Sequence, residues 1–203
     1  HFKAKFFFLK NIFFQSMPIT IAILGYSIAA TVVFTYVGLF GEYAVAGYGS
    51  ATRIEQVVLL PILGINTAII SIIAQNIGAK YYDRVEQSYF TSIKYGLFIM
   101  LIAGVVIFIS ADIVPKFFSS NPEVIMHGSM YLKISAFILP AYPIFFLSNG
   151  FFMALKKSEK AMVNNIARNV LVPVLSFYIA KYLNADFKTF FYIWAIFQWL
   201  ISL

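Results

Sequence analysis

Apolar runs long enough to cross a lipid bilayer recur along nearly all of the 203 positions. A helix needs about 20 mostly apolar residues to cross about 30 Å of hydrocarbon. Only 11% of the residues are charged, whereas soluble domains carry about 25%. A soluble fold would leave too much apolar surface facing water, so the sequence predicts an all-α, polytopic membrane protein.

Six membrane-spanning segments fit this length, and short polar connections separate them. The expected spans cover approximately residues 17–40, 44–77, 88–111, 124–154, 161–182 and 187–203. The last span stops with the chain at Leu203 and is barely long enough to cross, and the chain opens on His1 rather than Met. We therefore expect a six-helix bundle, residues 17–203, that is a piece of a longer protein.

The basic residues predict the orientation of the bundle, because short loops rich in Lys and Arg tend to stay in the cytoplasm. One set of alternate connections carries eight of them: Lys3, Lys5, Lys10, Lys80, Arg84, Lys156, Lys157 and Lys160. The opposite set carries Lys116, Lys181 and Lys188. The sequence thus predicts a multi-pass protein of the cell (inner) membrane whose N-terminal end is cytoplasmic. Topology also explains the net charge of +7 better than nucleic-acid binding does, because the charges are dispersed over loops.

Residues 1–16 form a separate expected unit before the first span. Phe2, Phe6, Leu9 and Phe13 fall on one side of a helix, away from Lys3 and Lys10. That pattern is typical of an amphipathic helix lying in the cytoplasmic membrane interface.

The usual components of an enzyme are missing from the sequence. There is no Cys, so thiolate metal sites and a Cys nucleophile are excluded, and two His residues cannot form a clustered zinc site. We find no Gly-rich phosphate loop and no nucleophile elbow. We therefore expect a protein that is not an enzyme and that has no cofactor or metal site.

Polar residues inside the spans are the candidates for function, because in lipid they usually face the protein interior or a water-filled cavity. In the second span, Tyr48, Glu55, Ile62 and Asn66 lie close to one line along a helix. No basic residue lies three or four positions from Glu55. Glu55 is therefore a candidate carrier of a proton or cation. The structural alternative is that Glu55 pairs with a basic residue of another helix, such as Lys133.

The fourth span carries a second polar line, formed by Tyr131, Ser135, Tyr142 and Asn149. Pro140 and Pro143 interrupt this span, and each removes a backbone donor. Interrupted helices often line transport cavities, although prolines also produce ordinary kinks in membrane helices. We hold both interpretations of this line open.

The second span and its exit, "AGYGSATRIEQVVLLPILGINTAIISIIAQNIGAKYYDR", resemble the multidrug and toxic compound extrusion (MATE) family. The later "NGFFMALKKS" and "NNIARNVLVPVLSF" are similar to the end of that family's tenth helix and to its eleventh helix. The resemblance implies that the chain is the C-terminal lobe of a twelve-helix antiporter working by alternating access, and that residues 1–16 are the cytoplasmic linker between its two lobes. Its partners would be an N-terminal lobe, the lipid bilayer and small amphipathic, often cationic substrates, with a proton or sodium as coupling ion.

The resemblance places Tyr26 and Tyr142 where some members have coupling acids. Because tyrosine cannot serve as a carboxylate, it implies that the principal ion site lies in the missing lobe and that Glu55 is an auxiliary or structural site. The cavity-lining candidates are Tyr26, Tyr48, Asn66, Tyr131, Ser135, Tyr142 and Asn149.

Two alternative functions remain open. A lipid-linked saccharide flippase of the same superfamily would need a basic cavity, and only Arg53, Lys94, Lys133 and Arg168 lie in or near the spans. The other alternative is a non-transporting structural membrane subunit.

Overall fold

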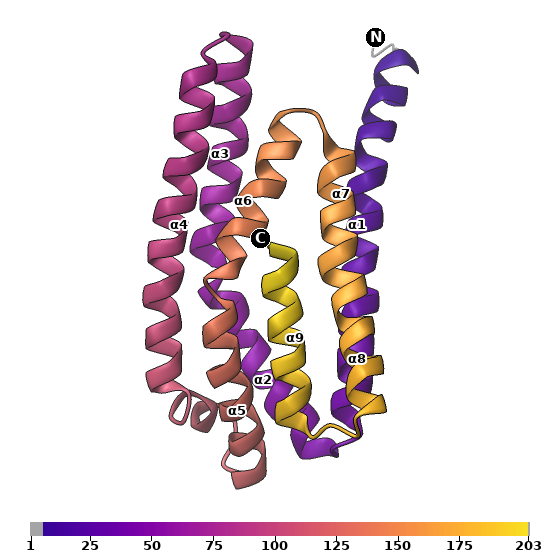
Figure 1. The fold of residues 1–203 in the computed structure, drawn as a ribbon, viewed down its shortest axis with the longest axis vertical. Helices are drawn as coiled ribbons and strands as arrows, with labels where there is room; N and C mark the ends of the chain where they lie inside the picture. Colours follow the sequence, from indigo (N-terminus) through magenta and orange to yellow (C-terminus); the bar gives the residue numbers. More distant parts are fainter. Residues whose placement is uncertain (1–5, 203) are drawn as a thin grey trace, which may run out of the picture.

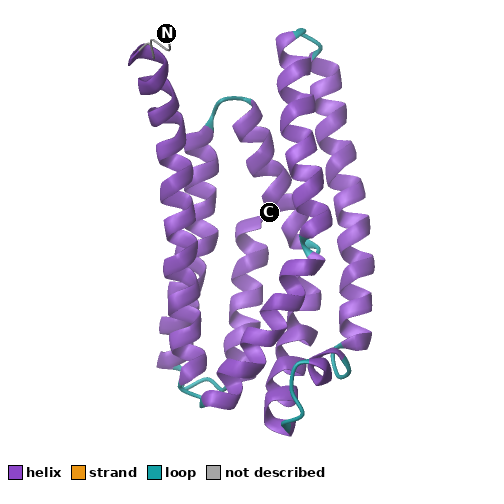
Figure 2. Ribbon diagram, turned by 180° about the vertical axis from the view of Figure 1, so that it is seen from behind, coloured by secondary structure: helices purple, strands orange, loops and turns teal. Residues whose placement is uncertain are grey.

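The computed structural model describes residues 6–202, with side chains from residue 24 onward and at residues 13, 16, 17, 20 and 21. Helices make up nearly all of this part of the chain (Figure 2). The elements are α1 (Phe6–Gly38), α2 (Glu42–Val58), α3 (Leu60–Gly78), α4 (Tyr82–Ser110), the 3₁₀ turn η1 (Val114–Phe117), α5 (Pro122–Ile138), α6 (Ala141–Ala154), α7 (Ser158–Ile166), the π-helical segment η2 (Ala167–Leu171), α8 (Val172–Tyr182) and α9 (Phe187–Ser202).

These elements run as six antiparallel passes through the bundle. The passes are α1, α2 with α3, α4, α5 with α6, α7 with η2 and α8, and α9. The start of α1 and the α3–α4 and α6–α7 connections lie at one end, and the other three connections lie at the opposite end (Figure 1). The loops that the charge pattern predicts to share one membrane face therefore do share one end of the bundle.

Length and hydropathy identify some of the helices that can cross a membrane. Within the described residues, α3 and α4 are each long and apolar enough to cross a membrane, and α5 with α6 forms a third span bent by 55°. The second half of α4 has an apolar outward surface, formed by exposed Tyr95, Phe98, Ile102, Val105 and Ile109. Water would disfavour such a surface and lipid favours it, so this face of the bundle suits a bilayer.

Prolines explain two of the breaks within the passes. The second pass is interrupted at Leu59, and Pro61 follows in the first turn of α3. The fourth pass bends between Ile138 and Ala141, at Pro140. Proline has no backbone N–H and its ring crowds the preceding turn, so a helix tends to kink or restart there. Both breaks fall inside spans that the hydropathy pattern treats as continuous.

The predicted boundary between the unit 1–16 and the first span, at residues 16 and 17, does not coincide with a break in the helix. Helix α1 runs continuously from Phe6 to Gly38, so the described part of the expected linker is helical with the first span. Residues 1–5 lie outside the described residues, as do the side chains of Phe6 and Leu9. The proposed amphipathic stripe therefore stays a prediction.

Close backbone contacts fix how α2 packs against α5. A Cβ atom on Gly47 would lie 2.6 Å from the Val124 carbonyl oxygen and 2.9 Å from the Gly128 backbone nitrogen. Only glycine fits at this crossing. Small residues at such contacts let membrane helices approach closely, where dispersion forces rather than the hydrophobic effect hold them together.

An ion pair joins the connection after α4 to α5. Lys133 Nζ lies 2.7 Å from Asp112 Oδ2, and the Ser129 hydroxyl donates a hydrogen bond to Asp112 Oδ1. The hydrogen bonds from Lys133 and then Ser129 lower the pKa of the Asp112 carboxyl. Lys133 thus pairs with Asp112, and not with Glu55 as in the structural alternative considered above.

Candidate functional site

Glu55 projects from α2 into the interior of the bundle, where its side chain is 6% exposed. The Tyr142 hydroxyl donates to its Oε1 at 2.7 Å, and the Tyr131 hydroxyl donates to its Oε2. These tyrosines come from α6 and α5, so the acid is held across the bend at Pro140. Glu55 forms no salt bridge with any residue of the described chain. Burying a carboxylate is costly unless its oxygens accept hydrogen bonds, and these two hydroxyls supply them.

A cavity of about 730 Å³ opens beside this carboxylate. Its walls come from most passes of the bundle, and they include Tyr26, Tyr48, Glu55, Tyr131, Tyr142 and Arg168. Aromatic rings form much of the surface near the acid: Tyr48 packs edge-on against Tyr131 with ring centroids 4.9 Å apart. A cavity of this volume fits a drug-sized ligand, since such sites span about 300–1,000 Å³.

Three of the residues proposed to line a cavity lie elsewhere. Ser135 is buried and donates to the Leu132 carbonyl, Asn149 accepts a hydrogen bond from the Asn164 side chain at 3.0 Å, and Asn66 packs against Gly150. None of the three belongs to the described lining of the cavity beside Glu55. The predicted polar lines placed these residues on the faces of Glu55 and Tyr142, but contacts with the α5 backbone, α6 and α7 keep them out of the lining.

Arg168 is the functional candidate that the sequence reasoning did not select. It lies in the π-helical segment η2, is 1% exposed, and its Nη1 donates to Ser202 Oγ at 2.8 Å. Its guanidinium carbon lies 4.5 Å from the ring centre of Tyr142 and 4.3 Å from that of Phe145. One signal was available, because Arg168 is the only charged residue in the interior of the fifth span. Intramembrane charges of this kind are functional candidates.

Tyr142 connects the acid and the base of this site. Its hydroxyl contacts Glu55 and its ring face contacts Arg168. Arginine stacked on an aromatic face keeps its charge while burying its plane. The cavity therefore contains one buried acid and one buried base, both oriented by the same side chain. No group of three or more metal-binding side chains occurs among the side chains that the structure describes.

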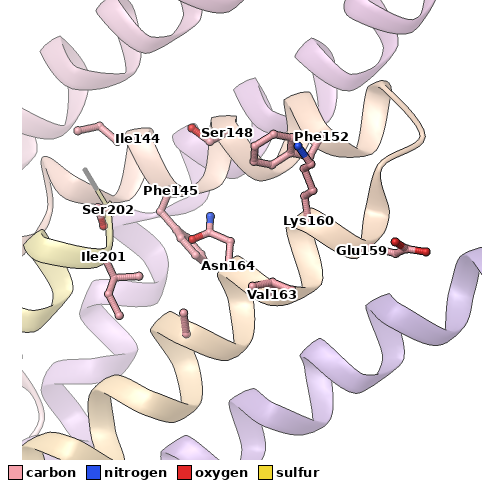
Figure 3. Close-up of a pocket in the computed structure, with 11 residues that line it drawn as sticks. Ile144, Phe145, Ser148, Phe152, Glu159, Lys160, Val163, Asn164, Ile201 and Ser202 are labelled. Carbon is pink, nitrogen blue, oxygen red and sulfur yellow. The ribbon is translucent and has the colours of Figure 1, made fainter.

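A second cavity, of about 760 Å³, lies between α6, α7 and the end of α9 (Figure 3). Its charged residues, Glu159 and Lys160, are exposed, and Lys160 lies over the Phe152 ring at 5.9 Å. Because its described lining contains no buried acid, we assign the candidate site to the cavity beside Glu55.

A helical bundle with an apolar exterior and a buried acid beside a central cavity has the architecture of a membrane transport protein. The chain belongs to the MatE family, whose model matches residues 18–178.

Curated relatives match most of this chain. The probable multidrug resistance protein YpnP of Bacillus subtilis is 26% identical over 74% of the chain and 32% of its own length. The multidrug export protein MepA of Staphylococcus haemolyticus is 24% identical over 82% of the chain and 37% of its length. The FAD transporter of Shewanella oneidensis is 25% identical over 71% of the chain and 32% of its length. The chain thus spans about a third of the length of these relatives.

Solved structures show the same fold. The outward-facing conformation of a multidrug resistance MATE family transporter superposes with a TM-score of 0.91, at 24% identity, over 99% of this chain and 46% of that one. The bent form of the Vibrio cholerae MATE transporter VcmN gives a TM-score of 0.85 at 19% identity, over 91% and 42% of the two chains. This chain therefore has the fold of somewhat less than half of a MATE transporter.

Proposed function

We propose that this chain forms the C-terminal lobe of an efflux antiporter that exchanges small amphipathic substrates for protons or sodium ions by alternating access. The lobe would sit in the cell (inner) membrane with residue 1 on the cytoplasmic side. Its inner face would meet an N-terminal lobe, and the cavity beside Glu55 would form part of the substrate path between them.

The observation that supports this proposal best is the environment of Glu55. The carboxyl group is buried, lines a drug-sized cavity and is held by two hydroxyls rather than by a cation. Such a group can take up or release a cation without first breaking a salt bridge. The proposed role of Glu55 is therefore ion coupling in this lobe, in addition to any site in the other lobe.

The names of relatives support multidrug export and also widen the range of substrates to be tested, since one relative is an FAD transporter. The flippase alternative is less well supported, because Arg168 is the only basic residue in the described lining of the cavity. The alternative of a non-transporting structural subunit predicts no cavity beside Glu55, so the cavity there disfavours it.

Replacement of Glu55 by Gln in the full-length transporter tests the proposal. We expect rhodamine 6G efflux driven by an imposed proton or sodium gradient to fall by about tenfold or more, because the amide keeps the size of the side chain but cannot carry the exchanged charge. Glu42→Gln is the matched control, because Glu42 is an exposed acid in the first turn of the same helix. Equal efflux by the two variants would refute the role assigned to Glu55.

A further inference from the structure

Two hydrogen-bond donors in the cavity wall have no partner among the described residues. Arg168 Nη2 and the Trp194 indole nitrogen are both buried and make no hydrogen bond there. Both residues line the cavity beside Glu55, one from η2 and the other from α9. Buried donors are nearly always paired in proteins, and a guanidinium can only donate. The wall therefore offers donors that lack acceptors.

The nearby acid does not supply the missing acceptor. Both carboxylate oxygens of Glu55 already accept hydrogen bonds, from Tyr142 and Tyr131. Gln198 also lines the cavity, and its Oε1 is buried without a partner. A side-chain amide can turn to present its NH₂ group instead, because its two ends are nearly equivalent in shape. Arg168 and Trp194 thus keep donors without acceptors, beside an amide that can present either an acceptor or its NH₂ group.

The guanidinium is also fixed in place. Nη1 is bound to Ser202 Oγ, whose own proton goes to the Gln198 carbonyl at 2.7 Å. The rings of Tyr142 and Phe145 cover the guanidinium plane. A donor that is already oriented binds an acceptor without losing much conformational freedom.

We propose that the Arg168 and Trp194 donors form a subsite for an anionic, oxygen-bearing group, such as a carboxylate or phosphate, of an aromatic amphipathic substrate. Arginine matches the planar geometry of such groups, and the tyrosine-lined wall suits a flat ring. This subsite deepens the proposed function, on which it rests: the substrates of this lobe would include aromatic anions and zwitterions as well as cations.

Two xanthene dyes that share a ring system but differ in charge provide the test. The binding of anionic carboxyfluorescein and cationic rhodamine 6G to the purified full-length transporter is measured by fluorescence anisotropy. We expect saturable binding of carboxyfluorescein to the wild type. Arg168→Gln should weaken carboxyfluorescein binding by about tenfold or more compared with its effect on rhodamine 6G binding, since a hydrogen bond to a charged group is lost. Arg168→Lys should restore part of this preference, because the charge is retained.

Two further variants complete the design. Arg53→Gln makes the same chemical change at an exposed position of α2 outside the cavity lining, and should bind carboxyfluorescein like the wild type. Trp194→Phe removes the indole N–H but keeps a ring, and should weaken carboxyfluorescein binding by about threefold. If Arg168→Gln fails to fold, the Trp194 variant decides the question, and unchanged binding overturns the subsite.

The outcomes separate this inference from the proposed function. A wild-type transporter that exports rhodamine 6G but shows no saturable carboxyfluorescein binding would overturn the subsite and leave the antiporter proposal standing. Equal weakening in the Arg168→Gln and Arg53→Gln variants would also overturn it. Carboxyfluorescein binding that depends on Arg168, together with efflux that is insensitive to Glu55→Gln, would support the subsite and refute the ion-coupling role.

Discussion

Glu55 remains buried in the bundle because each of its carboxylate oxygens receives a tyrosine hydroxyl. Hydrogen bonds to a charged group contribute about 1.5–3 kcal/mol each, and their loss leaves a costly unpaired oxygen. The two tyrosines are therefore structural supports for the acid as well as walls of the cavity.

Removing either hydroxyl should destabilise the protein through Glu55. We expect Tyr131→Phe and Tyr142→Phe each to lower the stability of the transporter in detergent by about 1.5–3 kcal/mol. In a Glu55→Gln background the same changes should cost less, because the amide is neutral. Thermal unfolding of the double-mutant cycle measures this coupling, and Tyr178→Phe, at an exposed position of α8, serves as the control. Additive effects would show that the tyrosines act independently of Glu55.

Three members of this site could be predicted from the sequence, but not Arg168 and not the arrangement of the four. Glu55, Tyr131 and Tyr142 are all polar residues inside apolar spans, which is a local signal. Their meeting depends on how α2, α5 and α6 pack, and no single span encodes that. Arg168 has a local signal too, as the only charged residue in the interior of the fifth span, but its position beside Tyr142 depends on how the π-helical segment packs.

At the scale of the helices, close backbone contacts and helix breaks determine how the passes are arranged around the cavity. The α2–α5 crossing requires a glycine at residue 47, and the breaks at Leu59 and Pro140 redirect the second and fourth passes. The hydropathy pattern predicts that these passes exist, because it responds to length and apolarity. It cannot predict that Asn66 and Asn149 lie outside the cavity lining, since that depends on their contacts with Gly150 and Asn164 of neighbouring helices.

Two glycines of α2 provide a test of the crossing. Gly47→Ala should destabilise the protein by about 1–3 kcal/mol, because the new methyl group would meet the backbone of α5. Gly49→Ala has nothing within 4 Å of the added carbon and should be neutral or stabilise by up to about 1 kcal/mol, since alanine favours helix. Thermal unfolding in detergent measures both, and equal stabilities would contradict the packing described for α2 and α5.

Asp186 caps the start of α9 and gives this helix a dependence on pH. Its Oδ1 accepts from the Thr189 backbone N–H at 3.1 Å, and hydrogen bonds from the Thr189 side chain and then its backbone lower the pKa of the Asp186 carboxyl. A lowered folded-state pKa means that the capping contribution is complete at neutral pH. It is lost as the pH falls through that lowered pKa.

We expect Asp186→Ala to cost at most about 1 kcal/mol at pH 7, because solvent screens this exposed cap, and to cost less in strong acid. Asp186→Asn keeps a capping acceptor that does not titrate, so it should retain most of the stability without the acid dependence. Unfolding curves of the three proteins between neutral and acidic pH make the comparison. A cost of Asp186→Ala that grows on acidification would contradict this sign.

At the scale of the whole molecule, the chain is a six-pass lobe whose cavity holds one buried acid and one buried base. The fold class and the MATE resemblance followed from the sequence, because the apolar runs and the motif of the second span are continuous in the chain, and both are confirmed. The chain spans about a third of the length of its curated relatives. The proposed function depends on what Glu55 contributes to cation exchange.

The number of cations exchanged for each molecule of rhodamine 6G, measured with the full-length transporter in proteoliposomes, tests this contribution most directly. We predict a lower ratio for Glu55→Gln than for the wild type, with saturable rhodamine 6G binding still measurable, because a neutral side chain removes one exchange site but not the cavity. An unchanged ratio in the Glu55→Gln transporter would contradict the claim that this buried carboxyl couples cation movement to efflux.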